Sequence, residues 1–187
     1  LGDVYKRQIL TAGSFDGTGG LAAAFEITGT APAYAQPSAS VNDVLRLTGG
    51  SPFTTALGAG NTIDVYVSAS ATEAGTYQGG FFTSLSAADL LTAVQSANWV
   101  FWGEAAGGSR AFNGLTYKPL LDFTGVTGVT VTTVGLTADF GDGAVSGSTT
   151  QFLFAAVPEP STVALAGIGL VTAAWIARRR AAARRPR

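Results

Sequence analysis

The chain has 187 residues, of which 11 are Lys or Arg and 12 are Asp or Glu, so its formal net charge is −1. Six of the basic residues lie in the last ten positions, which leaves residues 1–177 with five basic groups against twelve acidic ones, a balance of −7. An acidic body argues against nucleic acid as the main partner, because phosphate contacts require positive charge on the folded surface. The absence of Cys and His excludes cysteine nucleophiles, disulfides, zinc sites built on these residues and the usual general base near neutral pH. We therefore expect no enzymatic activity, no bound metal and no cofactor.

The length fits one domain with appendages. Residues 1–8 (LGDVYKRQ) differ in composition from the rest of the chain, and we interpret them as a remnant of cloning or sequence assembly. The sequence begins at Leu1 and contains no Met, so we expect it to be a fragment of a longer protein. The predicted extracytoplasmic domain spans residues 9–156.

Residues 9–156 alternate short strand-like runs with turn residues. The clearest run is 62–68, in which Ile63, Val65 and Val67 face one way and Asp64 and Tyr66 the other. The runs are rich in Thr, Val, Phe and Tyr, and Gly, Asn, Asp or Pro separate them, which is typical of an all-β domain. We expect strands at 21–28, 41–48, 62–68, 77–83, 99–102, 115–123, 126–134 and 151–155.

One segment has helical spacing instead. Residues 86–97 (SAADLLTAVQSA) place Leu90, Leu91 and Val94 on one helix face. Ser86 can cap this helix, and Asp89 three residues later resembles the acidic member of a capping box. The pattern predicts a helix of about three turns.

Two architectures fit these elements. Ile27, Leu47 and Val67 each lie near the end of a predicted strand and are 20 residues apart, a plausible rung length for stacked coils. The spacing favours the end or cap of a parallel β-solenoid with one short helix. A β-sandwich or jelly roll is the alternative.

The C-terminus has three parts in order. Residues 157–160 (VPEP) carry two prolines, which favour an extended linker. Residues 161–177 contain no charge, and as a helix they would be about 26 Å long, close to the roughly 30 Å bilayer core. Residues 178–187 are rich in Arg.

This order predicts a single C-terminal transmembrane helix. By the positive-inside rule the Arg-rich tail stays in the cytoplasm and the body faces outward. The tail begins with Arg178, Arg179 and Arg180. The residues that we assign to the anchor, with an interfacial tryptophan near its end, are Ser161, Leu165, Leu170, Trp175 and Ala177.

These residues resemble the PEP-CTERM sorting signal of Gram-negative bacteria, a short region also named the ice-binding protein C-terminal domain. The resemblance implies that Pro158, Glu159 and Pro160 form the recognition motif of an exosortase, which would process this chain as its substrate. It also implies that Arg178, Arg179 and Arg180 stop transfer. The implied course is export, anchoring in inner-membrane lipid, and later display on the cell surface or secretion.

The body resembles, more loosely, the region before the anchor in large PEP-CTERM surface proteins. The resemblance rests on residues 42–49, 60–66, 79–82 and 112–117. Those proteins carry autotransporter-associated β-solenoid repeats upstream. The resemblance implies that this chain is the C-terminal end of such a surface protein.

Two acidic loops invite a chemical interpretation. Asp139 and Asp142 lie in a glycine loop, but a calcium site needs more converging oxygens, and we interpret the loop as an exposed turn with Asx-type hydrogen bonds. The loop at 16–20 (DGTGG) lacks the Lys-Ser/Thr pair of a phosphate-binding loop, so we expect a glycine turn there.

Two further patterns have ordinary explanations. Thr130 and Thr132 form a single Thr-x-Thr copy, which is not the array of an ice-binding surface. Trp99, Phe101 and Trp102 could form a sugar-stacking platform, but we favour aromatic core packing.

The leading hypothesis is therefore a structural or adhesive protein of the cell surface or extracellular matrix. Extracellular polysaccharide is a candidate partner, through neutral sugar contacts or bridging cations. The alternatives are a carbohydrate-binding module of a secreted protein and the C-terminal fragment of a secreted hydrolase.

Overall fold

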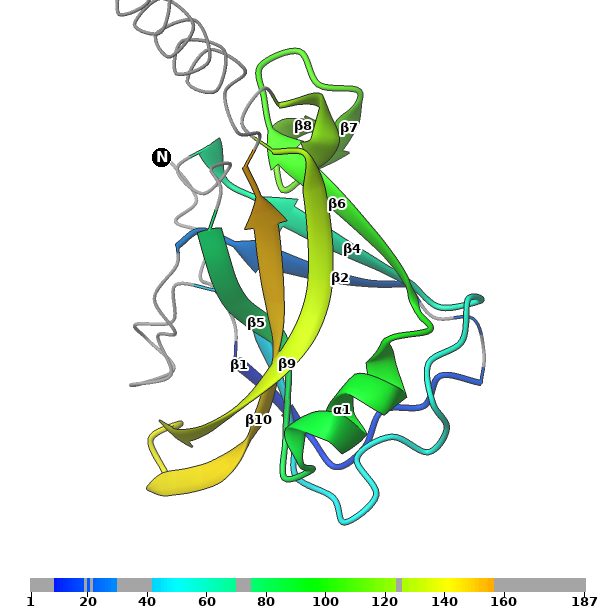
Figure 1. Cartoon of the computed structure of the whole chain (residues 1–187), viewed down its shortest axis with the longest axis vertical. Coiled ribbons are helices and arrows are strands. Elements are labelled where there is room, and N and C mark those ends of the chain that lie inside the picture. The colour runs from blue at the N-terminus through cyan, green and yellow to red at the C-terminus, as the bar shows by residue number, and fades with distance from the viewer. Residues whose placement is uncertain are drawn as a thin grey trace, which may run out of the picture. The chain divides into compact units, whose positions relative to one another are not determined.

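The computed structural model describes residues 9–18, 20, 22–29, 42–69, 75–123 and 126–156. The chain divides into two units, Leu1–Ala156 and Val157–Arg187, and the described residues all belong to the first. The described residues of this unit are mostly β-sheet with one short helix (Figure 1), which confirms the predicted all-β class. Its elements are β1 (Ile9–Ala12), β2 (Ala22–Ile27), β3 (Val44–Leu47), β4 (Thr62–Val67), β5 (Gly75–Thr83), α1 (Ala87–Val94), β6 (Asn98–Glu104), β7 (Arg110–Phe112), β8 (Leu115–Pro119), the 3₁₀ turn η2 (Leu120–Asp122), β9 (Gly128–Asp139) and β10 (Ala144–Ala155).

The strands form two curled five-stranded sheets. The first sheet has the order β1-β3-β5-β10-β9, and the second has the order β2-β4-β6-β8-β7. Strands β1 to β6 therefore alternate between the sheets, and within each sheet the three successive strands are parallel. Each sheet is then extended by antiparallel strands, β10 and β9 in the first and β8 and β7 in the second.

The 20-residue spacing predicted from the sequence is wrong as a repeat. Ile27 and Val67 are register partners in the second sheet, but Leu47 lies in β3 of the first sheet. Each turn of the chain contributes one strand to each sheet. Register partners are consequently 35 residues apart in the pair Ile9↔Val44 and 40 apart in Ile27↔Val67.

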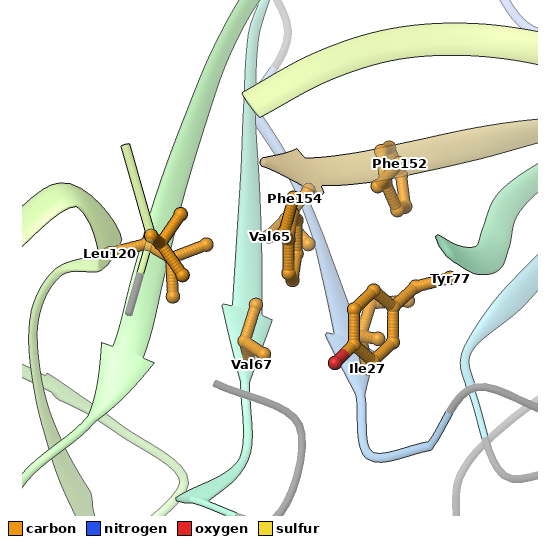
Figure 2. Packing of buried hydrophobic residues seen from close by; sticks show 8 residues of the cluster. Ile27, Val65, Val67, Tyr77, Leu120, Phe152 and Phe154 are labelled. Carbon is orange, nitrogen blue, oxygen red and sulfur yellow. The ribbon is translucent and has the colours of Figure 1, made fainter. Parts of the chain in front are cut away.

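The main core lies between the two sheets. Alternation along β4 turns Val65 and Val67 inward, where they belong to one buried cluster with Phe152 and Phe154 of β10 (Figure 2). A neighbouring cluster centres on Phe81 and the buried face of α1. Burial on this scale is the main stabilising term of the fold, at about 25 cal/mol per Å² of apolar surface removed from water.

Both sheets also bury part of their outer faces. In the first sheet, Val44 and Phe82 form a third cluster with Ala138 and Phe140 from the tip of the β9–β10 hairpin. In the second sheet, the ring of Tyr66 stacks on Phe112 of β7 with a centroid distance of 3.9 Å. This explains why Tyr66, predicted on the face opposite Val65, is only 2% exposed.

The predicted helix is confirmed in place and in its cap. The Ser86 side chain accepts a hydrogen bond from the Asp89 backbone N–H at 3.2 Å and donates one to the Asp89 carboxylate at 2.7 Å. Leu90 and Val94 are fully buried. The helix has eight residues, about 12 Å, so it is shorter than the three turns predicted.

The predicted strands are found, but their bounds differ from the prediction, and the largest differences lie in the C-terminal part of the β unit. The last two are longer than predicted, because β9 and β10 have 12 residues each and pair along their whole length. The strand expected at 115–123 ends at Pro119, which lacks a backbone N–H, and η2 follows. Strands β1 and β7, of four and three residues, were not predicted.

A bulge marks the change from parallel to antiparallel pairing at β5. The register of β10 against β5 shifts between Thr149 and Gln151. Thr150 Oγ1 accepts from the Phe81 N–H at 3.1 Å and donates to the Gly79 carbonyl. Gly80 has φ +77°, and a Cβ there would lie 2.6 Å from Thr150 Oγ1, so this position requires glycine.

Candidate functional site

The predicted sorting residues lie outside the described residues. This holds for Pro158, Glu159 and Pro160, for the anchor at 161–177 and for the Arg-rich end. In the part of the chain that the structure describes, no helix combines the length and apolarity needed to cross a bilayer. What the structure does define is the residue at which the β unit ends.

The last ladder of the β unit is complete at Ala155. Strand β10 pairs with β9 up to the register partners Ala155 and Gly128. The Thr127 backbone N–H then donates to the Ala155 carbonyl at 2.9 Å. The sheets therefore use no residue beyond 155 in the pairings that the structure describes.

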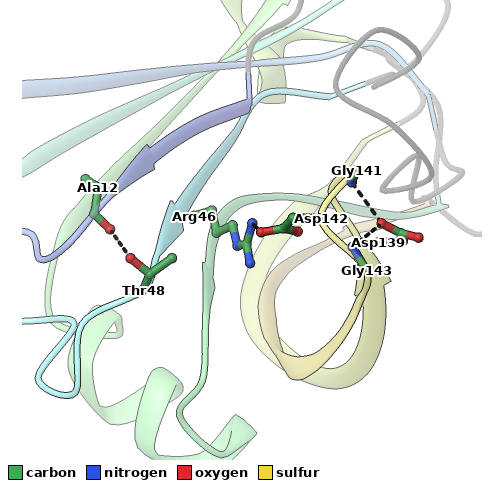
Figure 3. A network of polar contacts seen from close by, with 7 residues as sticks. All are labelled: Ala12, Arg46, Thr48, Asp139, Gly141, Asp142 and Gly143. Carbon is green, nitrogen blue, oxygen red and sulfur yellow. Dashed lines mark hydrogen bonds and ion pairs between the residues drawn. The ribbon is translucent and has the colours of Figure 1, made fainter.

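The acidic loop between β9 and β10 is a turn, as predicted (Figure 3). Asp139 Oδ1 accepts from the N–H groups of Gly141, at 2.8 Å, and Gly143, at 3.3 Å. Asp142 instead pairs with Arg46 NH1 at 2.6 Å. The two carboxylates therefore bind different partners within the turn and the sheet.

Arg46 connects this turn to the outer face of the first sheet. Its guanidinium lies 4.7 Å from the centroid of the Phe140 ring as well as against Asp142, and its side chain is 13% exposed whereas that of Asp142 is 57% exposed. We call this contact the Arg46 ion pair. It holds the hairpin tip over the sheet.

A second polar cluster lies on the outer face of the second sheet. Asp64 Oδ1 accepts from Trp102 Nε1 at 2.8 Å, and Asp64 Oδ2 pairs with Arg110 NH2 at 2.9 Å. Arg110 Nε also donates to the Tyr66 hydroxyl at 3.1 Å. This hydrogen bond, followed by electrostatic interactions with Tyr66 and Asp64, raises the pKa of Arg110. We call the contact the Asp64 ion pair.

Sequence reasoning did not find the Asp64 ion pair. Trp102 and Arg110 are 38 and 46 residues from Asp64, and only the register of β4, β6 and β7 brings them together. The available signal was a carboxylate on the opposite face from Ile63 and Val65, which indicated an outward Asp without identifying its partner.

The aromatic run in β6 packs mainly into the core, as favoured from the sequence. Trp99 and Phe101 lie 5.5 and 5.4 Å from the Phe152 ring, centroid to centroid. Trp99 Nε1 donates to the Val94 carbonyl at 3.0 Å. Trp102 faces the other way and is covered by the Arg110 guanidinium, 5.2 Å from its ring centroid. The three rings do not form a common platform.

The glycine loop after β1 is also a turn. Asp16 Oδ1 accepts from the Thr18 N–H and from Thr54 Oγ1, both at 3.0 Å. The Thr18 backbone hydrogen bond is the main reason that the pKa of Asp16 is lowered. Thr130 and Thr132 both lie on β9, the first exposed and the second half-buried.

The comparison with protein families places a PEP-CTERM protein-sorting motif at residues 156–180. This confirms the resemblance predicted for the C-terminus. The motif indicates an exported protein with a membrane-anchored sorting signal and exosortase as its processing partner. Among curated proteins and among solved structures, nothing matches the chain.

Proposed function

We propose that this chain is a structural or adhesive protein of the bacterial surface or extracellular matrix, which exosortase cleaves near Pro158, Glu159 and Pro160. Residues 161–177 would hold it in the inner membrane until then, with the Arg-rich end in the cytoplasm. The observation that best supports the proposal is where the β unit ends relative to the sorting motif. Strand β10 ends at Ala155 and the sorting motif begins at residue 156, so cleavage near the prolines would release the described β unit with its ladders intact.

The proposed role is non-enzymatic. It is supported by the way the β unit uses its carboxylates, because an acid–base pair or a cation site needs carboxylates that face a substrate or an ion. Those with structural hydrogen bonds or ion pairs are Asp16, Asp43, Asp64, Asp89, Glu104, Asp139 and Asp142.

We also propose that the unit is the closed end of a parallel β-solenoid. The support is the strand order, in which three successive pairs, β1/β2, β3/β4 and β5/β6, stack in parallel in both sheets. An antiparallel sandwich with hairpin and Greek-key connections has a different pattern. A stack of this kind transmits load along its axis, which suits a scaffold between the membrane and an extracellular polysaccharide.

The experiment that tests the proposal is a cell-fractionation blot. The 187-residue chain is expressed behind an export signal in a Gram-negative host, with and without exosortase. A variant with Pro158→Ala and Pro160→Ala tests the motif. The matched control is Pro119→Ala, a proline-to-alanine change at the end of β8 and outside the motif.

The proposal predicts a shorter form at the surface or in the medium, present only when both exosortase and the two prolines are present. The Pro119→Ala control should be processed like the wild type. A full-length protein in the inner membrane in every strain would contradict processing and leave only an anchored protein.

A further inference from the structure

The end of β10 lies very close in the sequence to the motif that exosortase would process. Phe154 and Ala155 are the last two residues of β10, and only Ala156 and Val157 separate them from Pro158. A proline has no backbone N–H, so neither proline of the motif supplies a backbone donor. A backbone donor that the enzyme uses on this side of the motif must therefore come from the residues directly before Pro158.

Ala155 is held to β9 by a pair of hydrogen bonds at the end of the ladder. It is the register partner of Gly128, the last pair between β9 and β10. Its carbonyl accepts from the Thr127 backbone N–H at 2.9 Å and from Thr127 Oγ1 at 3.3 Å. We call these two hydrogen bonds the Thr127 clamp. A carbonyl oxygen has two lone pairs, so the clamp leaves this oxygen no capacity to accept from an enzyme.

The residue before Ala155 attaches the same end of β10 to the main core. Phe154 is 3% exposed and belongs to the buried cluster that Figure 2 shows. Its ring lies 4.6 Å from that of Tyr77 and 6.0 Å from that of Phe101, centroid to centroid. Opening the ladder beyond Ala155 would move this ring into water, which is unfavourable. Opening at Ala155 alone has no such cost, because Ala155 and Thr127 are both exposed.

These contacts compete with the binding of a protease. An extended peptide is bound largely through its main-chain hydrogen bonds, and one backbone group cannot pair with the enzyme and with a neighbouring strand at once. A cut near Pro158 requires an extended segment that reaches back to Ala155. When a folded protein opens and closes quickly, the rate of its cleavage follows the population of the locally opened form.

We propose that Ala155 must leave β9 before exosortase cuts the chain, and that the Thr127 clamp therefore slows processing. The inference rests on the proposed function, because it requires exosortase to cleave near Pro158. Only the exposed end of β10 opens, while Phe154 stays in the core and keeps the rest of the ladder closed. The folded β unit thus sets the rate at which its own sorting signal is processed.

The first test follows the conversion of the 187-residue chain to its shorter form by pulse-chase labelling in a host with exosortase. Thr127→Ala removes the Oγ1 hydrogen bond and should speed processing about threefold, the effect of a weak hydrogen bond on the opened population. The matched control is Thr137→Ala, which removes a side-chain hydrogen bond of the same length, 3.3 Å to Ser146 Oγ, from the far end of the same hairpin. The control should be processed at the wild-type rate.

A second variant removes the need for opening. A flexible linker of about six Gly and Ser residues is inserted between Ala156 and Val157, so that the enzyme can bind the motif while β10 stays paired. This chain should be processed faster than the wild type, and adding Thr127→Ala to it should give no further gain. The same insert between Thr55 and Ala56, two exposed residues before β4, is the control and should leave the rate unchanged.

The third test holds the end of β10 closed reversibly. The chain has no Cys, so in the double variant Gly128→Cys and Ala155→Cys the one possible intrachain disulfide joins the last register pair. A Cβ at Gly128 meets no atom within 4 Å. Processing of the oxidised chain should be slower by about tenfold or more, because opening then requires reduction of the disulfide, and dithiothreitol should restore it. The single variant Ala155→Cys should not respond to the reductant.

Two results separate the failure of this inference from the failure of the proposed function. Equal rates for the wild type, Thr127→Ala, the linker variant and the oxidised double-cysteine variant would overturn the inference and leave processing by exosortase intact. A shorter form from none of these chains, the linker variant included, would overturn the proposed processing and this inference with it.

Discussion

The Arg46 and Asp64 ion pairs do the same structural task with opposite charges. In each pair one partner lies on a parallel strand, β3 or β4, and is nearly buried, with a side-chain exposure of 13% for Arg46 and 12% for Asp64. The other partner belongs to the antiparallel part and is exposed, at 57% for Asp142 and 47% for Arg110. An aromatic ring, Phe140 or Trp102, lies under the guanidinium in both.

The two pairs differ in how many polar groups bind the buried charged side chain. The Asp64 carboxylate has two donors, Trp102 Nε1 and Arg110 NH2, whereas Arg46 is paired with the single carboxylate of Asp142 and otherwise rests on a ring face. The outer faces of the two sheets are thus held by contacts of unequal strength. We expect the second sheet to depend more on its pair than the first.

The largest effect is expected for Asp64→Ala. This substitution removes two hydrogen bonds to a nearly buried carboxylate and leaves the Trp102 indole N–H without its acceptor, so we expect a loss of about 2–4 kcal/mol in the free energy of unfolding. Urea denaturation followed by circular dichroism measures it. Asp122→Ala is the matched control, because the Asp122 side chain is exposed, and it should stay within about 0.5 kcal/mol of wild type.

Asp142→Ala should have a smaller effect, about 1–2 kcal/mol. Arg46 would lose its carboxylate but keep the Phe140 ring and some access to water. Because Asp142 is half exposed, the difference from wild type should shrink in about 1 M salt. An equal loss of unfolding free energy for Asp142→Ala and Asp64→Ala, measured in the same urea series, would contradict the expected difference in strength between the two ion pairs.

Two substitutions of Arg110 test whether the Asp64 ion pair depends on the positive charge alone or also on the shape of the guanidinium group. Arg110→Ala should lower the melting temperature less than Asp64→Ala does, because the Asp64 carboxylate keeps the Trp102 N–H. Arg110→Lys should recover only part of that loss, since one ammonium cannot bind Asp64 and the Tyr66 hydroxyl as the guanidinium does. Full recovery by lysine would show that charge alone matters. Differential scanning calorimetry gives the order.

The smallest effect concerns Asp16, an exposed carboxylate outside both pairs. Its pKa is lowered from 3.8, chiefly by the Thr18 backbone hydrogen bond, so the carboxylate stabilises the fold above pH 3.8 and this contribution is lost as the pH falls through the lowered pKa. Asp16→Asn should therefore be slightly less stable than wild type at pH 6, and the difference should shrink as the pH falls below 3.8. A constant difference across that range, in urea titrations, would contradict the assignment.

Local patterns predicted the elements more accurately than their partners. The alternation of Ile63, Val65 and Val67 gave β4, and the Ser86 cap gave α1, because both signals are short-range. The pairing of Ile27 with Val67 depends on which strands share a sheet. An equal spacing of 20 residues could not show that Leu47 belongs to the opposite sheet.

The sites divide in the same way. The Asp139 turn was predicted, since its hydrogen bonds span at most four residues. The Arg46 and Asp64 ion pairs were not, because their partners are 96 and 46 residues apart and meet only through the antiparallel hairpins. The sorting motif could be recognised in the sequence because it consists of neighbouring segments in a fixed order and needs no long-range contact.

The measurement that tests the account most directly is the intact mass of the protein recovered from the surface or medium of a host that carries exosortase. The account predicts a mature chain that ends close to Pro158, Glu159 and Pro160, retains β10 to Ala155 and lacks the Arg-rich end. A recovered protein whose mass equals that of the uncleaved chain, with Arg187 still present, would contradict it.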